Sequence, residues 1–158
     1  MRSLFARCGA LAVFTVALDR LTKLWFMRLP NPEPFWFSNI LTRTHHQNTG
    51  LIANFPIPFA AILILTASIL VCVVFGLRHA LRAQDHQRSF ALSLVIAGAV
   101  GNIWDRLQWG FVFDWILLFG TSIINLADIA IALGILWYLF APTKIKTTYP
   151  LDDSTETP

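Results

Sequence analysis

Four long apolar segments, separated by more polar connections, dominate the hydrophobic pattern of the chain. They cover residues 4–27, 58–77, 89–107 and 124–142. Each approaches the roughly 20 apolar residues that an α-helix needs to cross the hydrocarbon of a bilayer. The segment 58–77 carries no charged residue at all. The pattern therefore predicts an all-α integral membrane protein with four transmembrane helices.

The connections between these segments carry a different pattern. Residues 28–57 contain closely spaced prolines and an aromatic cluster, Phe35 to Phe37, so we expect no continuous helix there. Its middle, 35–46, has extended character and is predicted to lie at the headgroup level. The apolar stretch 111–119 is too short to span and is expected to dip into the interface. Residues 1–143 then form one membrane-embedded domain, followed by a polar, disordered cytoplasmic tail over 144–158.

Composition agrees with lipid as the main solvent, since 56% of the residues are hydrophobic and 13% are charged. The net charge of +3 is spread between apolar runs and forms no basic stripe, which argues against a nucleic-acid partner. Cys8 and Cys72 lie in or beside apolar runs and have no ligand-type neighbours at metal-site spacing. We therefore expect no metal and no other cofactor.

The N-terminal stretch admits a second interpretation. Arg2 and Arg7 precede the apolar residues 8–18, as in a cleaved signal peptide. The apolar character resumes after Arg20 and continues to Met27, so we interpret the stretch as a retained first helix.

The basic residues indicate an orientation for the four helices. Lys and Arg favour the cytoplasmic side of a membrane protein. With both termini cytoplasmic, that side holds seven of them and the outer side holds five. This predicts a multi-pass membrane protein with both termini on the cytoplasmic side. The seven are Arg2, Arg7, Arg78, Arg82, Arg88, Lys144 and Lys146, and the five are Arg20, Lys23, Arg28, Arg43 and Arg106.

Four carboxylates then converge near the outer face: Asp19, Asp105, Asp114 and Asp128. Each costs several kcal/mol at membrane depth and so calls for a reason. For two of them we favour ion pairing over a direct part in chemistry. Asp19 and Lys23 stand at i, i+4 spacing on one helix face, and Asp105 adjoins Arg106, with which it is expected to close the third helix.

Asp114 and Asp128 have no Lys or Arg within seven residues. Two carboxyls brought close without cations share one proton, as in aspartic proteases that activate water. A proton relay or a structural role would use the same residues. Asn125 lies three residues before Asp128, and Asn102 three before Asp105, so these amides either shape a site or join helices by hydrogen bonds.

Five short strings in this order resemble the motifs of the lipoprotein signal peptidase family, the bacterial type II signal peptidases. They are Leu-Asp-Arg-Leu-Thr-Lys at 18–23, Asn-Thr-Gly at 48–50, Gly-Ala-Val-Gly-Asn-Ile-Trp-Asp-Arg at 98–106, Val-Phe-Asp-Trp at 112–115 and Asn-Leu-Ala-Asp at 125–128. The resemblance implies an intramembrane aspartic endopeptidase that removes signal peptides from prolipoproteins by cutting before the diacylglyceryl-modified cysteine. It also implies a small extracytoplasmic β-rich cradle and an interfacial lid within 30–57 and 107–123.

By the same resemblance, Asp114 and Asp128 match the catalytic pair, which would work without a metal. Substrate-binding and supporting positions match a further set: Asn48, Gly50, Asn102, Arg106, Asn125, Asp19, Lys23 and Asp105. The implied partners are lipid-modified prolipoprotein signal peptides and membrane lipid, and we expect a monomer.

The chain departs from the family pattern at a few positions near the site. Leu51 and Ile52 replace the small residues that usually follow Asn-Thr-Gly, Trp115 replaces the usual Phe, and Trp104 stands where an aliphatic residue is common. Larger side chains here would narrow or reshape the substrate groove. Two rival functions remain: a related peptidase with altered or lost substrate range, and a small ion or proton carrier. A carrier needs ionisable residues deeper in the bilayer, and their absence from the middles of the segments counts against it.

Overall fold

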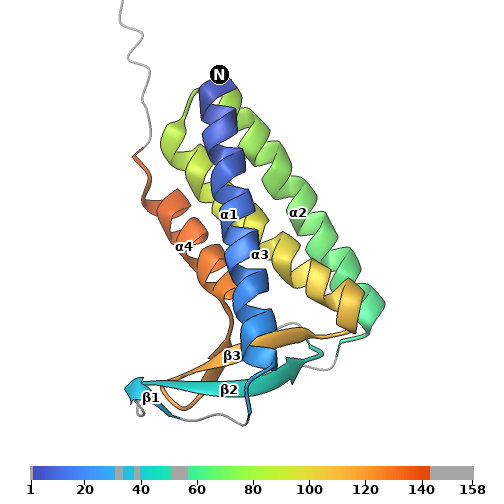
Figure 1. Ribbon diagram of the computed structural model, residues 1–158. Helices are drawn as coiled ribbons and strands as arrows, with labels where there is room; N and C mark the ends of the chain where they lie inside the picture. The colour runs from blue at the N-terminus through green and yellow to red at the C-terminus, as the bar shows by residue number, and fades with distance from the viewer. Residues whose placement is uncertain (1, 31–33, 38–39, 51–56, 143–158) are drawn as a thin grey trace, which may run out of the picture.

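The computed structural model describes residues 2–30, 34–37, 40–50 and 57–142. Its elements are α1 (Arg2–Met27), β1 (Pro34–Phe37), β2 (Leu41–Asn48), α2 (Phe59–Arg82), α3 (His86–Trp109), β3 (Val112–Leu118), β4 (Ser122–Ile124) and α4 (Leu126–Phe140). Figure 1 shows the helices as one bundle and the strands as a sheet lying across one end of it. The N-terminus lies at the opposite end.

The four predicted helices are present, with small differences at their ends. α2 continues past Leu77 to Arg82, and α4 begins at Leu126 because Asn125 caps it. The predicted tail 144–158 and the departures Leu51 and Ile52 lie outside the described residues.

α3 is the central helix of the bundle and packs against the other three. α3 and α4 lie so close that their glycines face backbone atoms of the other helix. A Cβ atom on Gly98 would lie 2.3 Å from the carbonyl oxygen of Ala127, and one on Gly134 would lie 2.6 Å from that of Ala91. Small residues permit such close packing between helices in a membrane.

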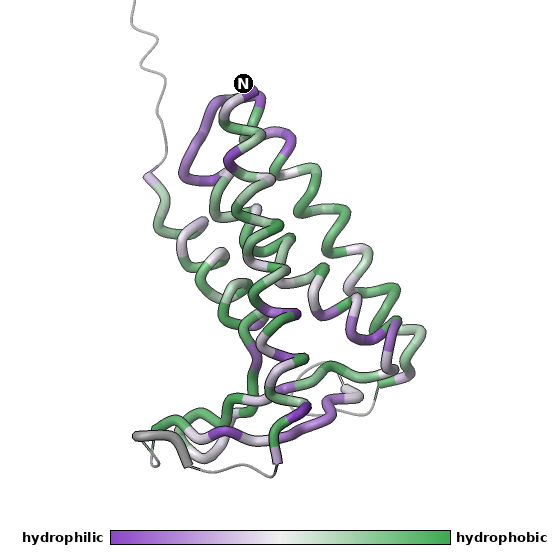
Figure 2. The backbone as a smooth tube through the Cα atoms, viewed as in Figure 1, coloured by the Kyte–Doolittle hydropathy of each residue, from purple (hydrophilic) through white to green (hydrophobic). Residues whose placement is uncertain are grey.

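Two described helices, α2 and α3, are long and apolar enough to cross a membrane, compared with the four spans predicted from the sequence. Few residues of α2 are buried by the rest of the protein, and Figure 2 shows mostly hydrophobic residues along the helix. An apolar helix face left uncovered at this scale needs lipid rather than water around it. Its exposed large residues include Ile64, Leu65, Ile69, Val71, Val74 and Phe75.

The sheet is antiparallel with the order β1-β2-β3-β4. The stretch 111–119, expected to dip into the interface, is mostly strand β3, because its backbone groups pair with β2 on one side and β4 on the other. Buried Phe113, Trp115 and Ile116 form an apolar core below the bundle. The Phe26 ring, near the end of α1, stacks on Trp115 at 4.0 Å between centroids, which attaches the sheet to the helices.

Candidate active site

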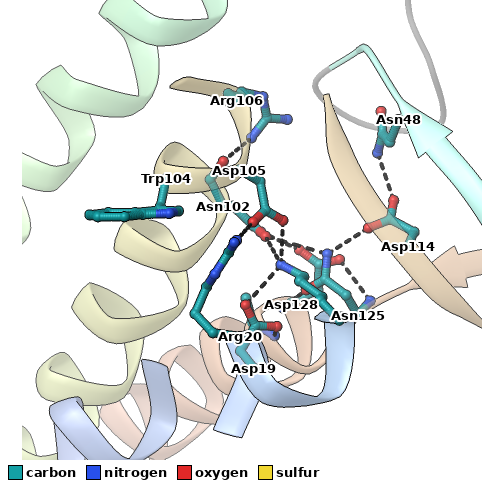
Figure 3. Close-up of polar contacts among 12 residues, drawn as sticks. Asp19, Arg20, Asn48, Asn102, Trp104, Asp105, Arg106, Asp114, Asn125 and Asp128 are labelled. Atoms are coloured by element: carbon teal, nitrogen blue, oxygen red, sulfur yellow. Dashed lines mark hydrogen bonds and ion pairs between the residues drawn. The ribbon is translucent and has the colours of Figure 1, made fainter. Parts of the chain in front are cut away.

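Asn125 connects the two carboxylates that the sequence singled out. Asp114 lies on β3 with a side chain that is 1% exposed, and Asp128 lies in the first turn of α4. The side-chain amide of Asn125 donates to Asp114 Oδ1 at 2.5 Å, and its backbone N–H donates to Asp128 Oδ2 at 3.1 Å. Figure 3 shows both carboxylates converging on Asn125.

The start of α4 explains this placement. Asn125 is the N-cap, and its side-chain oxygen accepts from the backbone N–H of Asp128 at 3.0 Å. Together with the return bond to Asp128 Oδ2, this forms a capping box, which satisfies two backbone donors at the helix end. One residue therefore both begins the helix and fixes the direction of the two carboxylates.

Two further asparagines occupy the remaining carboxylate oxygens. Asn48, at the end of β2, donates to Asp114 Oδ2 at 3.0 Å, and Asn102 on α3 donates to Asp128 Oδ1 at 2.8 Å. Each of the four oxygens thus accepts one hydrogen bond from an amide group. Donors from three separate elements hold the two carboxyl groups in one orientation.

The position of Asp114 in the sheet changes the pKa of its carboxyl group. Its burial, and next the charge of Asp128, raise its pKa from 3.8 to about 6. Hydrogen bonds from Asn48 and Asn125 and the charge of Lys23 oppose that rise. A carboxyl with a pKa near 6 changes protonation close to neutral pH, as a group that gives or takes protons must.

Lys23 forms the second centre of the site. Its ammonium lies 2.8 Å from Asp19, 2.7 Å from Asp105 and 3.2 Å from Asn102 Oδ1, so all three of its N–H donors have partners. The other oxygen of Asp19 accepts from the backbone N–H of Ala127 at 3.0 Å. These contacts confirm the predicted Asp19–Lys23 pair and fasten α1 to α3 and α4.

The expected closure of the third helix by Asp105 and Arg106 is wrong. Asp105 pairs with Lys23 and Arg20 on α1, because adjacent residues of a helix point in directions about 100° apart. Arg106 instead donates to the carbonyl oxygen of Gly50 at 2.9 Å and to that of Asn102 at 3.4 Å. Arg20 was not predicted as a partner of Asp105, although its place next to Asp19 in the motif at 18–23 was a usable signal.

All ten predicted site residues belong to one continuous network of hydrogen bonds and ion pairs. Gly50 joins it through a backbone N–H that donates to Asn48 Oδ1 at 3.0 Å. Of the two tryptophans that depart from the family pattern, Trp115 is in the apolar core, and Trp104 is exposed on α3, where its indole donates to Gln108.

The fold is similar to that of bacterial membrane enzymes. Two solved structures, both described as bacterial membrane enzymes studied by the in meso method, superpose on this chain with a TM-score of 0.73. One is 28% identical and covers 86% of this chain and 87% of its own, and the other is 27% identical and covers 88% and 94%.

The sequence defines the family more narrowly. The family described as signal peptidase (SPase) II matches residues 11–143, so the chain belongs to the signal peptidase II family and is a peptidase. A lipoprotein signal peptidase of Pseudoalteromonas atlantica is 33% identical, over 85% of this chain and 90% of that protein. One of Rickettsia canadensis is also 33% identical, over 84% of this chain and 72% of that protein.

Proposed function

We propose that this protein is an intramembrane aspartic endopeptidase in which Asp114 and Asp128 activate a water molecule. The main supporting observation is that Asn125 hydrogen-bonds to both carboxyl groups, the buried one of Asp114 and the partly buried one of Asp128, and so holds them near each other. A low-polarity site and mutual repulsion favour one proton on the pair. That protonation state supplies a base and an acid side by side.

The reaction then follows from the two roles. The charged carboxylate removes a proton from water as the water oxygen attacks the amide carbon, and the protonated carboxyl gives its proton to the carbonyl oxygen. The tetrahedral intermediate collapses when the carboxyl that received the water proton gives it to the leaving nitrogen and the C–N bond breaks, while the other carboxylate takes back a proton from a hydroxyl of the intermediate. Asn48, Asn102 and Asn125 act as positioning residues, because they hold the carboxylates through hydrogen bonds.

We propose prolipoproteins as the substrates, cut just before the diacylglyceryl-modified cysteine so that the signal peptide is released. The support is membership of the signal peptidase II family and the naming of the relatives as lipoprotein signal peptidases. A signal peptide is itself an apolar helix in the bilayer, so a site at the membrane surface reaches the scissile bond without extracting the peptide from lipid.

The proposed topology places four spans in the plasma (inner) membrane of a bacterium, with both termini cytoplasmic and the chain acting as a monomer. α1 is long enough to cross, and its buried charges are paired within the bundle. α4 is short, at 15 residues, and the extended segment before it reaches the sheet. The site then lies near the outer face, where the sheet covers the bundle end.

The test is cleavage of a diacylglyceryl-modified prolipoprotein by the purified protein in detergent. We expect Asp114→Asn and Asp128→Asn each to lose nearly all activity, since both changes preserve shape and remove the charge. Asp85→Asn is the matched control, because Asp85 caps α3 and asparagine caps equally well. Cleavage by either dyad variant at the wild-type rate would overturn the two-aspartate mechanism.

A further inference from the structure

A cavity of about 350 Å³ lies at the bundle end opposite the sheet, and no residue of the candidate active site lines it. It is lined by Arg2 and Phe5 of α1 and by Arg78, Leu81 and Arg82 of α2. Figure 1 shows the first turns of α1 and the last turns of α2 side by side at this end. Three arginines and two apolar residues therefore line one cavity.

No described carboxylate lines this cavity or pairs with any of its three arginines. The acidic residue nearest to α2 in sequence, Asp85, is used elsewhere: its side chain caps α3 and lies 3.8 Å from Arg88. Three cations gathered without an internal counter-ion repel one another, unless an anion from outside the chain lies between them.

Helix electrostatics accounts for only part of this arrangement. Arg78 and Arg82 lie near the C-terminal end of α2, where a cation is favourable beside the helix dipole. Arg2 lies in the first turn of α1, where a cation is unfavourable and where no acidic residue compensates it. The position of Arg2 facing the two arginines of α2 points to a ligand shared by both helices.

We propose that this cavity binds the phosphate headgroup of an anionic phospholipid from the leaflet at this end of the bundle. Guanidinium groups bind phosphate oxygens in pairs of parallel hydrogen bonds. Phe5 and Leu81 offer an apolar surface to the glycerol and the first methylenes of the acyl chains. A basic pocket between helices at a membrane surface is a recognised arrangement for anionic lipid headgroups.

The test is native mass spectrometry of the full-length protein in a neutral detergent, titrated with dimyristoyl phosphatidylglycerol and, separately, with dimyristoyl phosphatidylcholine. We expect the wild type to bind the anionic lipid more tightly. Arg78→Gln and Arg82→Gln should each weaken that binding by about fivefold. The matched control is Arg7→Gln, which removes one charge from the same end of α1 outside the cavity and should leave binding unchanged.

Three outcomes would overturn the proposal. Equal binding of the two lipids would remove the headgroup preference, and an equal loss in Arg7→Gln would show diffuse attraction to charge. Displacement of the lipid by millimolar inorganic phosphate would make the ligand a soluble phosphate. Arg2→Gln, at an exposed side chain, provides the same comparison should Arg78→Gln fold poorly. Prolipoprotein cleavage should stay unchanged in the arginine variants that bind the anionic lipid weakly, which would separate this site from the peptidase site.

Discussion

Asn48 on β2 and Asp114 on β3 are joined across the sheet by a 3.0 Å hydrogen bond from the amide of Asn48 to Oδ2 of Asp114. This bond favours the charged form of the carboxyl and so lowers the pKa of Asp114. Burial and the charge of Asp128 raise the pKa more strongly, and the resulting value is about 6. The register of the two strands is therefore part of what sets the protonation of the site.

The pH profile of cleavage should report this balance. Above a pH of about 6, Asp114 loses its proton beside the charged Asp128 and the pair lacks its acid, so kcat/KM should fall on the alkaline side. In Asn48→Ala the pKa of Asp114 rises further, which should move that limb upward by about one pH unit. Gln47→Ala, on the other face of β2, should leave the limb in place. A limb that moves downward in Asn48→Ala would contradict the assignment.

Removal of the Asn125 side chain should separate helix capping from catalysis. Asn125→Ala loses both the cap and the donor to Asp114, whereas Asn125→Ser keeps a capping oxygen but lacks the amide. We expect both variants to lose cleavage by about tenfold or more, because the carboxylates lose their common orientation. Asn125→Ala should also unfold about 1 kcal/mol more easily than Asn125→Ser, as measured by thermal unfolding in detergent. Full activity in Asn125→Ser would show that capping alone suffices.

Lys23→Met should strongly destabilise the protein. The change leaves Asp19 and Asp105 as buried charges without their shared cation, which costs about 3–5 kcal/mol when a buried pair is broken. Arg88→Met is the control, since Arg88 lies in a longer, partly exposed pair with Asp85 whose loss should cost less than about 1 kcal/mol. Equal melting temperatures for the two variants would rule out a stabilising role for the buried network.

Gly98→Ala should disturb the contact between α3 and α4. The added Cβ would lie 2.3 Å from the carbonyl oxygen of Ala127, one residue before Asp128, so the helices must separate. Overpacking of this kind costs about 1–3 kcal/mol and should reduce cleavage as well as stability. Gly9→Ala on α1 is the matched control, because its Cβ meets nothing within 4 Å. Wild-type stability of Gly98→Ala would argue against the close helix contact.

Local features predicted a large part of this structure. The lengths of the apolar runs predicted the four helices, because a helix that buries its backbone polar groups in lipid must be long and apolar. The spacing of Asp19 and Lys23 predicted their ion pair, because residues four apart share one helix face. The five motifs selected ten polar residues, and the structure places all of them in one network.

Local sequence patterns did not predict the contacts between segments that are far apart in the chain. Asp105 has Arg106 as its neighbour in sequence, yet it pairs with Lys23 and Arg20 on another helix. Likewise, no cation lies near Asp114 in sequence, and it is the fold that brings the charge of Lys23 close enough to affect its pKa.

The sequence by itself thus determined the helices, the family motifs and the set of polar residues, since these depend on composition and on spacing along one element. Only the tertiary structure decided which of those residues meet. The register of β2 and β3 places Asn48 opposite Val112, from where its amide reaches Asp114, and the capping box at the start of α4 turns Asn125 toward both carboxylates. The physical reason is that helix formation follows from short-range periodicity, whereas the partner of a buried charge depends on how elements far apart in the chain pack together.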